Sequence, residues 1–148
     1  MIQEFVKEFE KNKHTLESRL SAGHPRNYKE LVTEVIELLG NVSEWDWEVP
    51  DPRRIHEIDD GDYQGTLVYI IGAKRHQPSD YWYVKISYGS CSGCDSLQAI
   101  QYTEYTEYTD KPNKKQLNMY MTLALHIIQG MHKMGEEVDE LERLVDYE

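Results

Sequence analysis

Hydrophobic residues recur every three or four positions over the first part of the chain, with charged residues between them. This spacing predicts an amphipathic helix over residues 2–21, which Gly23-His24-Pro25 ends. Asn27, followed by Glu30, is the signature of a capped second helix, whose apolar positions continue to Leu39. Because the connection between the two is short, residues 1–41 are predicted to form an antiparallel helical pair.

The middle of the chain has the two-residue period of β-strands. Strands are predicted around residues 54–58, 66–71 and 81–88, after a break that two prolines impose at 49–52. The second strand is apolar at successive positions, as in a well-covered central strand, whereas the third alternates between apolar and polar side chains. The connecting segments are short, which favours an antiparallel meander over residues 53–89.

Helical signals return after the meander. A short helix is predicted to begin at Asp95, and Asn113 with Gln116 opens what is predicted to be the longest helix, before a last acidic amphipathic segment. The predicted fold class is α+β, with two N-terminal helices, a three-stranded antiparallel sheet and C-terminal helices over 95–148. No linker separates these parts, so residues 1–148 are predicted to form one domain.

The chain is strongly acidic, with a formal net charge of −11 over 148 residues. Residues 44–62 carry eight acids against two arginines, and residues 136–148 carry seven acids against one arginine. Such a surface repels phosphate backbones, which argues against direct nucleic-acid binding. Apart from favouring solubility, it complements a partner protein with a basic surface, including a surface that normally holds nucleic acid.

The sequence predicts a cytoplasmic protein. No segment approaches the roughly 20 apolar residues that a membrane span needs, and the first residues lack the apolar core of a signal peptide. In a reducing compartment, a structural disulfide between Cys91 and Cys94 is not expected.

Both cysteines lie in the segment Cys91-Ser92-Gly93-Cys94, between the third strand and the short helix, and three interpretations are open. The spacing is that of half a zinc site, for which His56 and His76 are the candidate remaining ligands. A Cys-x-x-Cys pair before a helix also occurs in thiol redox proteins, although here the βαβ context is missing. The favoured interpretation is a tight turn with packed cysteines and no cofactor.

Aromatic residues are the best candidates for partner contacts. Tyr102, Tyr105 and Tyr108 recur at every third position, which places them on one ridge of a helix or in an exposed loop. Trp45 and Trp47 lie among carboxylates, a mixture typical of protein-binding surfaces, but their burial in the core is at least as strong an alternative. Hydrolase, phosphate-loop and zinc-protease motifs do not occur in the sequence.

Three strings of residues resemble small uncharacterised proteins encoded by bacteriophages and prophages. They are Asp62-Tyr63-Gln64-Gly65, Tyr81-Trp82-Tyr83-Val84, and Tyr88-Gly89-Ser90-Cys91-Ser92-Gly93-Cys94-Asp95 followed by Leu97. The resemblance covers residues 58–100, about a third of the chain, and it carries no known activity. It implies a phage origin and no mechanism.

We therefore predict a non-enzymatic, phage-type accessory protein without a cofactor, which binds a host or defence protein. The most specific version of this prediction is that the protein inhibits a nucleic-acid-handling complex, in the manner of anti-CRISPR proteins. The predicted partner-binding residues are Tyr102, Tyr105, Tyr108, Glu136, Glu137, Asp139 and Glu140. The alternatives are a zinc-binding or redox module built on Cys91 and Cys94, and a structural or assembly protein of a virion.

Overall fold

A computed structural model describes residues 2–61, 64–75, 80–89, 95–101 and 110–134. The helices in these ranges are α1 (Ile2–Ser21), α2 (Tyr28–Glu37), the 3-10 helix η1 (Asp46–Glu48), α3 (Ser96–Gln101) and α4 (Lys114–Gln129). The strands are β1 (Pro50–Asp59), β2 (Gly65–Ala73), β3 (Tyr81–Tyr88) and β4 (His132–Lys133), which form one antiparallel sheet in the order β1-β2-β3-β4. The predicted α+β fold is confirmed, and the short β4 is an addition to the three predicted strands.

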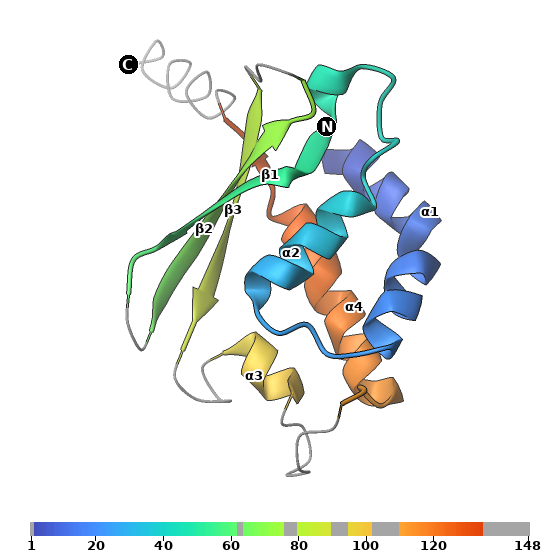
Figure 1. The fold of residues 1–148 in the computed structure, drawn as a ribbon, viewed down its shortest axis with the longest axis vertical. Coiled ribbons are helices and arrows are strands. Elements are labelled where there is room, and N and C mark those ends of the chain that lie inside the picture. The colour runs from blue at the N-terminus through green and yellow to red at the C-terminus, as the bar shows by residue number, and fades with distance from the viewer. Residues whose placement is uncertain (1, 62–63, 76–79, 90–94, 102–109, 135–148) are drawn as a thin grey trace, which may run out of the picture.

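The three long helices α1, α2 and α4 lie on one side of the sheet, and the core is packed between the two layers (Figure 1). Helix α1 packs on α4, and α2 packs on both β1 and α4. The largest fully buried side chains are Trp82, Tyr69, Tyr120, Phe5, Leu16, Leu20, Leu31, Ile36, Leu39, Ile71, Ile128 and Met131. None of the helices in the described ranges is both long and apolar enough to cross a membrane.

Local capping signals explain where the helices begin. The side chain of Asn27 accepts a hydrogen bond from the Glu30 backbone N–H (2.8 Å), which is one half of a capping box, while the Glu30 carboxylate binds Arg26. Asn113 and Gln116 form a complete capping box. Asp95 accepts from two backbone N–H groups in the first turn of α3. The prediction that the longest helix begins at Asn113 is wrong, since α4 has 16 residues and α1 has 20.

Strand β1 begins earlier than the sequence predicts. The prolines at positions 50 and 52 do not break the chain but belong to the strand, whose pairing register with β2 shifts between Pro50 and Ile55. Because β1 is at the edge of the sheet, it has a neighbour on one side only, and a missing proline N–H is tolerated there.

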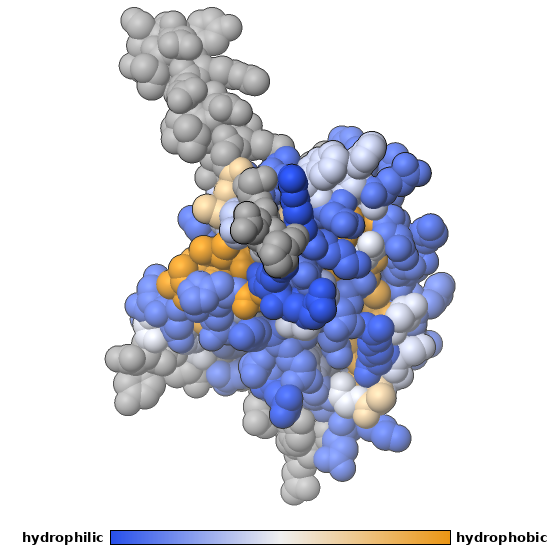
Figure 2. All heavy atoms as spheres, turned by 45° about the horizontal axis from the view of Figure 1, so that its top comes forward, coloured by the Kyte–Doolittle hydropathy of each residue, from blue (hydrophilic) through white to orange (hydrophobic). Residues whose placement is uncertain are grey.

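Strand β2 is central, but the helices cover only one of its faces. Leu67, Tyr69 and Ile71 are buried beneath the helices, whereas the residues between them, such as Val68 and Ile70, are only half-buried. The predicted central position of this strand is confirmed, and its cover is complete on the helix side and partial on the other among the described residues. We call the side away from the helices the open face, and its side chains include His56, Ile58, Val68, Ile70, Tyr81, Tyr83, Lys85 and His132. In Figure 2 an orange, hydrophobic area lies on the left of the molecule, where Figure 1 places the sheet.

Candidate functional site

Most of the residues that the sequence proposes for a site lie outside the described ranges. These residues are Cys91, Cys94, His76, Tyr102, Tyr105, Tyr108, Glu136, Glu137, Asp139 and Glu140. His56 is described, and its side chain is exposed on the open face of β1. Among the described residues, no group of three or more His, Cys, Asp or Glu side chains gathers closely enough to hold a metal ion.

The two tryptophans of the acidic segment lie on the surface. Trp45 is 55% exposed and Trp47 is 39% exposed, so the interpretation that places them in the core is wrong. Their rings stack on each other, with centroids 4.8 Å apart and planes 22° from parallel. A stacked pair of exposed indoles presents a large apolar area with a fixed shape.

Backbone contacts hold this pair in place. The Trp45 carbonyl accepts from the Glu48 N–H (2.9 Å), and the Val49 carbonyl accepts from the Lys74 N–H (2.9 Å), which ties η1 to the end of β2. Glu44 and Asp46 flank the rings, and both are exposed. Neither carboxylate forms an ion pair within the part of the chain that the structure describes. We call Glu44, Trp45, Asp46 and Trp47 the tryptophan patch.

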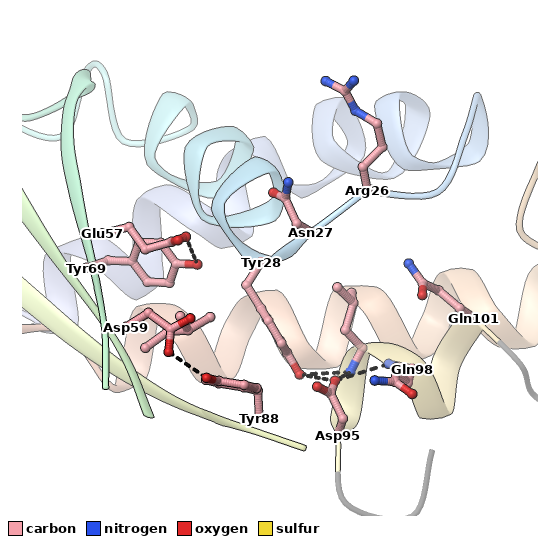
Figure 3. A pocket seen from close by; sticks show the side chains of 12 residues that line it. Arg26, Asn27, Tyr28, Glu57, Asp59, Tyr69, Tyr88, Asp95, Gln98 and Gln101 are labelled. Carbon is pink, nitrogen blue, oxygen red and sulfur yellow. Dashed lines mark hydrogen bonds between the residues drawn. The ribbon is translucent and has the colours of Figure 1, made fainter. Parts of the chain in front are cut away.

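A second candidate is an open hollow of about 330 Å³, located where α2 begins and where α3 and one end of the sheet meet (Figure 3). Its apolar floor includes Leu67 and Leu97, and its rim includes Arg26. Its polar wall consists of three tyrosines, three acids and three amides, namely Tyr28, Tyr69, Tyr88, Glu57, Asp59, Asp95, Asn27, Gln98 and Gln101. The hollow exists because the last two helix-facing positions of β1 are carboxylates, which are exposed here and do not pack beneath the helical layer.

Each tyrosine hydroxyl at the hollow lies within hydrogen-bond distance of a carboxylate, and that of Tyr88 also lies 2.6 Å from the Gly61 carbonyl oxygen. The O–O distances are 2.6 Å for Tyr28 with Asp95, 2.8 Å for Tyr69 with Glu57, and 2.5 Å for Tyr88 with Asp59. Sheet register explains the second pair, because Glu57 and Tyr69 are directly opposite on β1 and β2. The pairs of Tyr28 and Tyr88 join segments that are 67 and 29 residues apart in the sequence.

The same contacts shift the acidity of the groups. Burial, together with the hydrogen bond to Asp95, raises the pKa of Tyr28 well above its ordinary value. Burial and the bond to Glu57 likewise raise the pKa of Tyr69. In contrast, the hydrogen bond from Tyr88, followed by the Gly61 N–H, lowers the pKa of Asp59. Both buried phenols are therefore neutral and Asp59 is charged at neutral pH.

The raised phenol pKa values predict a loss of stability in alkali. Above about pH 10 the unfolded chain releases phenol protons that the folded chain retains, so the free energy of unfolding falls as pH rises. Tyr69→Phe removes one of these protons and makes the decline with pH shallower than in the wild type. Urea denaturation at several pH values between about 8 and 11 measures both slopes. Equal slopes for Tyr69→Phe and wild type would contradict a raised pKa of Tyr69 in the folded chain.

Sequence reasoning missed the hollow. Its residues come from α2, β1, β2, β3 and α3, and only the tertiary fold brings them together. One signal was present, because Tyr88, Asp95 and Leu97 belong to the string that carries the resemblance to phage proteins. No family model, curated protein or solved structure matches the chain. The proposals below therefore rest on the sequence and on the geometry of the molecule.

Proposed function

We propose that this chain is a non-enzymatic, phage-type accessory protein that binds a host or defence protein through the tryptophan patch. The observation that carries the proposal is the exposure of two stacked indole rings next to carboxylates that form no ion pair with any described residue. Tryptophan is among the residues that contribute most to binding when a partner buries them. A pair that is already ordered loses little conformational freedom when the complex forms.

The charge of the patch favours a basic partner. Glu44 and Asp46 are exposed and form no ion pair among the described residues, so lysine or arginine side chains of a partner can pair with them. The indole faces also attract such cations. A protein surface that normally holds nucleic acid has this chemistry, and occupying it would inhibit a nucleic-acid-handling complex in the manner of anti-CRISPR proteins.

Capture from a bacterial lysate tests the proposal. The tagged protein is incubated with a nuclease-treated lysate at about 50 mM salt, and bound proteins are then eluted with duplex DNA. We expect DNA to release a nucleic-acid-handling protein, because DNA and the acidic chain compete for one basic surface. Retention of the same protein in excess DNA would contradict the proposal, and so would its equal capture by a variant carrying Trp45→Ala and Trp47→Ala.

A further inference from the structure

We propose that the hollow between α2, α3 and the sheet is a binding site for an organic cation, that is, a guanidinium or ammonium group on an aliphatic stem. This inference goes beyond the proposed function and does not depend on it. Strand β1 spans the distance between the two sites, since η1 precedes the strand and Asp59 ends it. Ten residues of strand correspond to roughly 30 Å, so the hollow and the tryptophan patch are separate surfaces.

The first argument is the balance of donors and acceptors. The hydroxyls of Tyr28, Tyr69 and Tyr88 each lie within hydrogen-bond distance of a carboxylate. The side-chain amides of Gln98 and Gln101 donate to backbone carbonyls, at 3.0 Å each. These donors are thus committed, whereas the Asn27 side-chain amide and the terminal N–H groups of Arg26, which also line the hollow, have no acceptor among the described residues. An anion is disfavoured by the negative charge of the lining and not by a lack of donors.

Acceptor capacity also remains at the hollow. A carboxylate accepts about four hydrogen bonds. Asp95 uses both its oxygens to hold backbone and tyrosine groups, but Glu57 and Asp59 are exposed and retain lone pairs. A ligand with several N–H groups fits this set of acceptors.

The second argument is charge. Three carboxylates line the hollow against one guanidinium, that of Arg26. Arg26 lies at the rim, its side chain is 86% exposed, and its Nε binds Glu30 at 2.8 Å. The hydrogen bonds that Asp59 accepts lower its pKa, so it keeps its charge well below neutral pH. A positive ligand is therefore favoured over a neutral one of equal shape.

The third argument is the shape and composition of the walls. Leu67 and Leu97 give the hollow an apolar floor that suits an aliphatic stem, and the half-buried Tyr88 adds an aromatic ring of the kind that attracts cations. A volume of about 330 Å³ accommodates a ligand the size of an arginine side chain. The cation can come from a protein side chain or from a free amine, which share this chemistry.

Amide NMR titration of the full chain tests the site with two probes. Agmatine represents a free amine, and a blocked tripeptide with arginine between two glycines represents a protein side chain. The same tripeptide with citrulline is the neutral control. We expect saturable shifts at millimolar concentration for the amides of Tyr69, Leu97 and Gln98, with the arginine probe at least about tenfold tighter than the citrulline probe. Binding of agmatine alone assigns the site to free amines, and binding of the tripeptide assigns it to protein side chains.

Two double variants, each of which replaces two carboxylates by amides, complete the experiment. Glu57→Gln with Asp59→Asn keeps the shape of the wall and is expected to weaken binding of the arginine probe by about tenfold or more. Glu44→Gln with Asp46→Asn alters the tryptophan patch instead, and should leave probe binding unchanged. The inference is overturned if neither cationic probe gives saturable shifts at these amides of the wild type, or if Glu57→Gln with Asp59→Asn binds as tightly as the wild type. The NMR shifts do not depend on whether the variant carrying Trp45→Ala and Trp47→Ala captures a partner, so the two proposals can fail separately.

Discussion

Replacing Trp45 and Trp47 together by alanine is expected to weaken the complex with the partner by about 100-fold or more. Each ring contributes a large apolar area, and the two act as one stacked unit in the free protein. The partner loses both the desolvated contact and the indole faces that attract its cations. Calorimetry or biolayer interferometry with the purified partner measures the dissociation constant.

Two controls make this result specific to the patch. Tyr81→Ala removes another exposed aromatic side chain, on the open face, and is expected to leave the dissociation constant unchanged. Because both tryptophans are exposed, the free energy of unfolding of the double variant should lie within about 1 kcal/mol of that of the wild type. A double variant that remains folded and binds as tightly as the wild type would remove the patch from the interface.

The second strong effect is expected in the core, where Trp82→Ala should lower the free energy of unfolding by about 3–5 kcal/mol. Trp82 is fully buried on the helix side of β3 and packs against the Phe5 ring, with centroids 5.8 Å apart. Its removal leaves a cavity between the sheet and α1. Since whole domains are stable by only about 5–15 kcal/mol, this single change removes a large part of the total.

Neighbouring substitutions show whether the effect arises from packing. Trp82→Phe keeps a ring and removes an indole N–H that has no hydrogen-bond partner among the described residues, so it should cost less than alanine. Tyr81→Ala, at the adjacent exposed position of β3, should change stability by no more than about 0.5 kcal/mol. Urea denaturation compares the three variants. A loss below about 1 kcal/mol for Trp82→Ala would refute the packing of the core as described.

Features that depend on neighbouring residues in the sequence were predictable. The cap residues Asn27, Asp95 and Asn113 mark the starts of three helices, because a cap acts within one turn. The alternation along residues 81–88 gave the correct buried face of β3. Strand β4 has only two residues, too few to show a period, and was not predicted.

Features that depend on position in the fold were not predictable. The two prolines of β1 are tolerated because the strand is at an edge, which the sequence does not reveal. Trp45 and Trp47 are hydrophobic enough for the core, and only the placement of η1 at the surface exposes them. Glu57 and Asp59 were part of a solvated acidic segment in the sequence, whereas the fold places them in the wall of a hollow. The residues lining it range from Arg26 to Gln101, and no local pattern joins such distant positions.

The salt dependence of the complex tests most directly whether an acidic, tryptophan-bearing surface binds a basic partner. The dissociation constant of the purified pair is measured between about 50 and about 500 mM sodium chloride. Screening of the charges of Glu44 and Asp46 and of the partner's cations predicts binding that weakens by about tenfold or more across this range. An affinity that is constant or rises with salt would contradict charge complementarity as the basis of recognition.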